Sequence, residues 1–114
     1  MKYMLQLYMN DTREQFEARS DEEKQEIYAG WAAIRSAPGV TPGEELADPS
    51  AATTVRVSDG RALSTDGPFA ETKESLAGWF IVEAEDLDAV IELAATVPTA
   101  RIGGAVEIRP IVER

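Results

Sequence analysis

The segment from Leu76 to Val82 constrains the fold more than any other part of the chain. Its residues, Leu-Ala-Gly-Trp-Phe-Ile-Val, are apolar on both faces of an extended strand. That pattern is typical of a central strand that is covered on both sides. Helices usually cover only one face of a small antiparallel sheet, so the second face needs another cover, which a second subunit would supply. Gly78 within this strand lets a neighbouring strand, a side chain or a ligand approach closely.

Four more segments have the periodicity of regular elements. Residues 2–9 alternate between an apolar face and a mixed face, as a half-buried strand does. Ser20 begins a capping box for a helix that the Pro38-Gly39 pair stops, and Asp86 caps a second helix that Pro98 ends. Residues 105–112 form the last strand, at an edge because of Pro110. The second helix is expected to bury a stripe made of Leu87, Val90, Ile91, Ala94 and Val97.

Residues 53–65 are predicted to form a β-hairpin, because Asp59-Gly60 is the strongest local hairpin signal. Two registers are open. A two-residue loop pairs Val55 with Ser64. A three-residue loop pairs Val55 with Leu63 and collects apolar side chains on one face, so we favour it.

The order of elements predicts the fold class. With the extra strand of the hairpin set aside, it reads β-α-β-β-α-β, the split β-α-β pattern of ferredoxin-like proteins. We therefore expect an α+β fold in which two helices cover one face of an antiparallel sheet. The 114 residues are expected to form a single domain, residues 1–114.

Composition narrows the classes of function. The net charge is −10, which disfavours binding to nucleic acids and to anionic membranes. The chain has no Cys and no His, so any acid–base chemistry falls to carboxylates, Lys or Tyr. No cofactor and no metal site is predicted. No segment resembles a signal peptide or a membrane span, and we expect a cytoplasmic protein.

The candidate site is the stretch Asp66–Glu74, a Gly-Pro turn followed by several charged residues. An ordinary tight turn with solvated charges is the plain alternative. If the stretch is catalytic, a carboxylate is the base and Lys73 or Arg109 neutralises developing negative charge. The candidate catalytic residues are then Asp66, Glu71 and Lys73. The candidate ligand-binding residues are Tyr8, Gly67, Pro68, Phe69 and Arg109.

The stretch DGPFAETKE, with the strand LAGWFIVEA and the helix DLDAVIELAATVP after it, resembles the YCII-related, or DGPF, family. The start MKYMLQLY and the end GGAVEIRPIVER are also similar to that family, so the resemblance covers nearly the whole chain. It implies a dimeric α+β barrel of ferredoxin-like subunits, that is, a homodimer formed through the open face of the sheet.

The resemblance says less about function. Some relatives are proposed to use a His–Asp dyad, which this chain lacks, and one related branch removes chloride from a chlorinated hydroquinone. Genes of such proteins often lie beside those of extracytoplasmic-function sigma factors. We therefore expect a small-molecule binding or regulatory module with a cleft near the DGPF motif. The alternatives are an enzyme of lyase or hydrolase type with a carboxylate base, and a motif that only organises the loop or the dimer seam.

Overall fold

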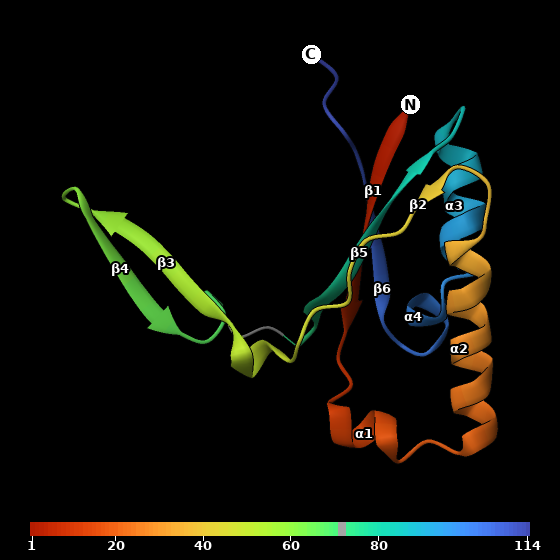
Figure 1. Ribbon diagram of the computed structural model, residues 1–114, viewed down its shortest axis with the longest axis horizontal. Helices are drawn as coiled ribbons and strands as arrows, with labels where there is room; N and C mark the ends of the chain where they lie inside the picture. Colours follow the sequence, from red (N-terminus) through yellow and green to blue (C-terminus); the bar gives the residue numbers. More distant parts are fainter. Residues whose placement is uncertain (71–72) are drawn as a thin grey trace.

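Four strands form an antiparallel sheet in the order β2-β5-β1-β6, and the helices lie on one side of it (Figure 1). The computed structural model describes residues 1–70 and 73–114. The strands are β1 (Lys2–Met9), β2 (Val40–Thr41), β5 (Ser75–Glu83) and β6 (Ala105–Pro110). The main helices are α2 (Asp21–Arg35), between β1 and β2, and α3 (Leu87–Ala95), between β5 and β6. This arrangement confirms the predicted ferredoxin-like α+β fold, with β6 at an edge. The second strand of the sheet is the short β2, whereas the prediction counted a strand of the hairpin in that place.

The two faces of the sheet differ in what covers them. Tyr3, Leu5 and Leu7 of β1 are buried against the helices. Phe80 and Val82 of β5 point to the same side, because β1 and β5 pair Leu5 with Phe80 and Tyr3 with Val82. The opposite face, which we call the open face, carries the partly buried side chains Met4, Gln6, Tyr8, Leu76, Trp79 and Ile81.

The predicted helix caps are largely confirmed. Ser20 accepts a hydrogen bond from the Glu23 backbone N–H, and Asp86 accepts one from the Ala89 N–H. The interpretation of Pro98 was incomplete, because this residue also begins the short helix α4 (Pro98–Arg101). The two other short helical segments are α1 (Arg13–Glu17) and η1 (Pro49–Ala51).

The predicted core stripe of α3 was too wide. Val90, Ala94 and Val97 are buried, but Leu87 and Ile91 are 48% and 49% exposed. The helix packs through a narrow face, and its i+4 pair Leu87 and Ile91 lies beyond the edge of that face.

The predicted hairpin forms a separate two-stranded sheet of β3 (Thr53–Ser58) and β4 (Arg61–Asp66). The register we favoured is wrong, because Val55 pairs with Ser64 and the loop has two residues. Asp59 and Gly60 both have positive φ, 52° and 76°, as a type I′ turn requires. Local turn chemistry therefore set the register. Collecting apolar side chains on one face would not have stabilised the other register, because residues 55–66 are all exposed.

The hairpin projects from the rest of the molecule, and we call residues 53–66 the arm (Figure 1). The radius of gyration is 16.1 Å, whereas a compact domain of this length has about 13 Å. The molecule measures 46 × 44 × 19 Å along its principal axes. Among the described residues, no helix is both long and apolar enough to cross a bilayer.

Candidate functional site

A pocket lies where the arm joins the sheet, and we call it the root pocket. Its volume is about 600 Å³. The open face supplies Tyr8 and Leu76 to its wall, from the adjacent ends of β1 and β5. The remaining wall comes from the foot of the arm, from η1 and from the turn after β4: residues 46–49, 51–54, 68–70, 74 and 75.

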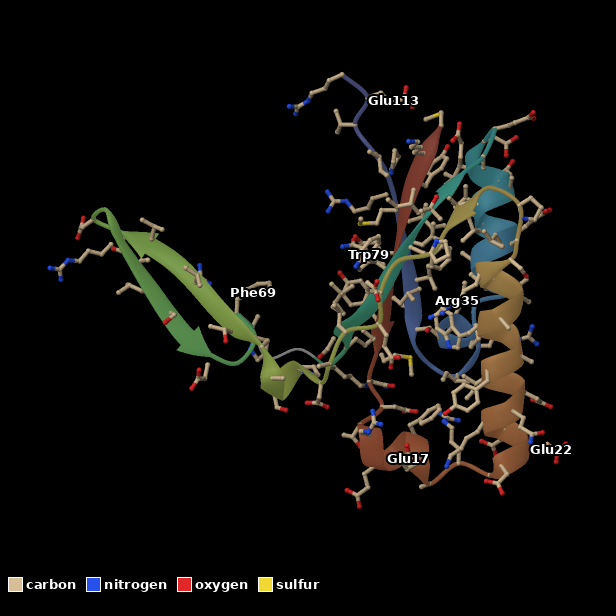
Figure 2. The ribbon with its side chains drawn as sticks, viewed as in Figure 1. Glu17, Glu22, Arg35, Phe69, Trp79 and Glu113 are labelled. Atoms are coloured by element: carbon tan, nitrogen blue, oxygen red, sulfur yellow. The ribbon has the colours of Figure 1, made fainter. Side chains whose placement is uncertain are left out.

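Two hydrogen bonds fix the backbone at the foot of the arm. The Gly67 N–H donates to the Ala52 carbonyl oxygen at 2.7 Å, and the Thr54 hydroxyl donates to the Gly67 carbonyl oxygen at 2.8 Å. Gly67 has a φ of 101°, a conformation that other residues rarely adopt. The turn places Pro68 and Phe69 on the pocket wall, where Phe69 remains 77% exposed at the base of the arm (Figure 2).

Asp48 is a carboxylate on the pocket wall that the sequence analysis did not single out. It caps η1 by accepting a hydrogen bond from the Ser50 backbone N–H at 2.9 Å. This hydrogen bond holds the pKa of the Asp48 carboxyl below its ordinary value. The residues Asp48-Pro49-Ser50 predict a turn, and the structure has the short helical turn η1 there. The sequence contains no signal that this turn lines the same pocket as Pro68.

The structure brings together only part of the predicted site. Tyr8, Pro68 and Phe69 line the root pocket, and Gly67 shapes the turn that holds them. Asp66 does not line this pocket; it is exposed at the end of β4, paired with Thr53.

The remaining predicted residues lie elsewhere. Lys73 lines a second cavity. Arg109 is exposed on β6, paired with Met4 of β1 on the open face. Glu71 lies outside the described residues.

The second cavity has a volume of about 1120 Å³ and lies between α1, α2 and the sheet. Aromatic side chains from the helices line it: Phe16, Tyr28 and Trp31. Phe16 and Tyr28 meet edge to face, with ring centroids 6.1 Å apart. An ion pair of 2.6 Å between Arg19 and Asp11 joins the connection before α2 to the chain before α1 and raises the pKa of Arg19.

These positions decide what chemistry the site can support. The proposed base Asp66 and the proposed cation Lys73 do not share a pocket among those described. In the part of the chain that the structure describes, no group of three or more Asp or Glu side chains is placed to hold a metal ion. The root pocket instead combines an apolar wall with a few hydrogen-bonding groups.

Comparison with known proteins agrees with the family resemblance of the sequence. The model of the YCII-related domain matches residues 1–114. The chain belongs to the YCII-related domain family. A relative from Rhizobium meliloti (strain 1021), "Uncharacterized protein R00369", is 33% identical over 99 residues, which cover 82% of this chain and 80% of that protein. This relative carries no stated activity, so the function of the present YCII-related protein has to be inferred from its own residues.

Proposed function

We propose that this YCII-related protein is a small-molecule binding or regulatory module whose ligand occupies the root pocket. The observation that supports this proposal is the convergence of Pro68 and Phe69 with Tyr8 on one pocket. These residues are about sixty positions apart in the chain. The volume of about 600 Å³ lies within the range of roughly 300–1,000 Å³ that is common for small-molecule sites.

The lining suggests the chemical class of the ligand. Leu46, Leu76 and the two aromatic rings of Tyr8 and Phe69 offer apolar surface. Asp48 and Glu74 are the charged side chains among the described lining residues, and both are acidic. Together with the net charge of −10, they disfavour an anion. A neutral or cationic molecule with an apolar or aromatic body fits this wall best.

The enzyme alternative has less support. It requires a carboxylate base beside a cation that neutralises negative charge as it develops. The described wall of the root pocket includes neither Lys nor Arg, and Asp66 is outside it. We therefore propose binding without assigning a reaction.

We also propose that two copies of the chain associate through the open face. Trp79 lies on this face, on the side of the sheet away from the helices (Figure 2). Met4 and Ile81 are paired beside it. Partly buried apolar side chains on an uncovered sheet face are typical of a surface that a partner covers.

A thermal-shift screen against neutral and cationic metabolites tests the binding proposal, because a ligand that binds only the folded state raises Tm. Phe69→Ala should weaken the binding of any compound found by about tenfold or more, since aromatic contacts carry a large share of ligand affinity. Leu63→Ala is the matched control, because Leu63 is exposed on the arm and does not line the pocket. If both variants bind as the natural chain does, the ligand does not occupy the root pocket.

A further inference from the structure

The arm has little of its own chain to pack against. Every residue from 55 to 66 is exposed, and Val57, Val55 and Leu63 are 71%, 62% and 53% exposed. A two-stranded hairpin by itself is only marginally stable in water. Both outer edges of this hairpin are unpaired in the described sheets, which makes them templates for association. We therefore infer that the arm needs another surface to pack against, which the described part of the chain does not supply.

The surface area of the chain gives a measure of what is missing. The accessible surface is 8340 Å², whereas a folded monomer of 12.4 kDa is expected to expose about 6,100 Å². The excess is roughly 2,200 Å², which is the scale that one subunit buries in a large, obligate dimer. A small accessory contact of a few hundred Å² would leave most of this excess exposed.

The two faces of the arm are not equivalent. The pairing of Val55 with Ser64 and of Val57 with Ala62 puts these four side chains on one face. The opposite face carries Arg56, Arg61 and Leu63. This pairing also puts Asp66 on the face with Val55 and Val57, but only at its root end. Burying an unpaired guanidinium is costly, so the outer part of this face, around Val55 and Val57, is the one suited to a dry contact.

Charge favours the arm as the part that approaches another copy. Residues 53–66 contain two Arg and two Asp, so the net charge of −10 lies entirely in the rest of the chain. Two copies repel each other through those other parts. A neutral arm with an apolar face meets little of this repulsion.

From these observations, we propose that the arm binds a second copy of this chain, and that this copy covers the mouth of the root pocket. Figure 1 shows the arm standing away from the open face at an angle, with the two joined at the arm's foot. The root pocket is at this junction, since Tyr8 and Leu76 line it from the open face and Thr54 from the arm. A subunit seated in the angle contacts the arm and the open face together. By two-fold symmetry, the arm of each copy then packs on the other copy, an arrangement that we call the clasp.

The role of the covered pocket as a ligand site rests on the proposed function, but its coverage does not. Coverage is a property of the assembly, and it can be measured without any ligand. The two statements are therefore tested separately.

Sedimentation equilibrium at micromolar concentration tests the clasp with two matched variants. Val57→Asp places a charge on the apolar face of the arm, and Leu63→Asp places one on the opposite face near the same level. Both residues are exposed in the single chain, so neither change should disturb its folding, which circular dichroism checks. We expect Val57→Asp to weaken the dimer at least tenfold and Leu63→Asp to change it less than about threefold. A natural chain of 12.4 kDa in solution would overturn the proposal, and so would equal effects of the two variants.

Thiol labelling tests the coverage of the pocket. The chain has no Cys, so Ala70→Cys creates a single thiol on the pocket wall. Its reaction with 5,5′-dithiobis(2-nitrobenzoate) should be at least fivefold faster when Val57→Asp is added, and unchanged when Leu63→Asp is added. Ala33→Cys on the exposed side of α2 is the control and should react at one rate in all backgrounds. Equal rates for the Ala70→Cys thiol in dimer and monomer would overturn the coverage. A failed ligand screen would instead count against the proposed function alone.

Discussion

The backbone N–H of Gly67 donates a 2.7 Å hydrogen bond to the carbonyl oxygen of Ala52, and this bond closes the base of the arm. The two residues flank β3 and β4, so the bond acts as one more rung beyond the last strand pair, Thr53 with Asp66. The direction in which the arm leaves the sheet therefore depends on the conformation of Gly67.

Gly67→Ala should loosen the arm without unfolding the sheet. The φ of 101° is unfavourable for a residue with a Cβ by about 1–2 kcal/mol, although no atom lies within 4 Å of where that Cβ would be. Amide hydrogen exchange should become faster in residues 53–66 and stay the same in β1 and β5. Ser64→Ala, an exposed change on the arm, is the control and should leave both regions as they are. Faster exchange throughout the sheet would show that the turn supports more than the arm.

Gly43→Ala should destabilise the sheet itself. A Cβ at this position would overlap the carbonyl oxygen and the ring of Trp79, and the backbone of both segments would have to separate. Such overpacking costs about 1–3 kcal/mol. Urea unfolding should show a lower midpoint for Gly43→Ala and an unchanged midpoint for Glu44→Ala, whose side chain is exposed. Equal midpoints for Gly43→Ala and the natural chain would mean that the edge beside Trp79 is looser than the structure shows.

The sequence predicted β1, β5, β6 and the two main helices because their signals are local and repeat. Alternation in residues 2–9 and the side-chain caps Ser20 and Asp86 need no knowledge of distant contacts. Gly78 was expected to admit a close neighbour, and the carbonyl oxygen of Glu44 lies 2.9 Å from where its Cβ would be. The identity of that neighbour was not predictable, because residues 40–46 have little strand pattern of their own.

The hairpin shows where reasoning from the sequence failed. The Asp59-Gly60 turn was recognised, but the register was chosen on the assumption that the arm packs one face on the core. Residues 55–66 of the arm are all exposed, so turn geometry decided the pairing of Val55 with Ser64. The candidate site was predicted only in part, because local sequence patterns do not show which distant segments meet. The motif identified Pro68 and Phe69, whereas Asp48 reaches the pocket only through the tertiary path of residues 46–54.

The fluorescence of Trp79 should report association through the open face. In a Trp31→Phe variant Trp79 is the only tryptophan, and Trp31 lies on the helix side, partly buried against the core. A second copy on the open face removes water from around Trp79, so dilution from micromolar to nanomolar concentration should shift its emission to longer wavelength. The matched Trp79→Phe variant, which retains Trp31, should show no shift. A constant emission from Trp79 over the dilution series would argue against association through this face.

Asp48 should contribute a pH-dependent part of the stability. Its pKa is lowered from the ordinary value of 3.8 in the folded chain, chiefly by the hydrogen bond from the Ser50 backbone N–H. The folded state then binds a proton less readily than the unfolded state, so the stabilising contribution is fully present above about pH 5 and is lost as the pH falls through the folded pKa. Urea unfolding of the natural chain and of Asp48→Asn, measured from pH 7 to about pH 2.5, should give free energies whose difference changes only below about pH 5. Ser50→Ala keeps the backbone N–H and should retain most of the pH dependence. A difference between Asp48→Asn and the natural chain that is constant over the whole range would show that the hydrogen bond does not favour the ionised carboxylate.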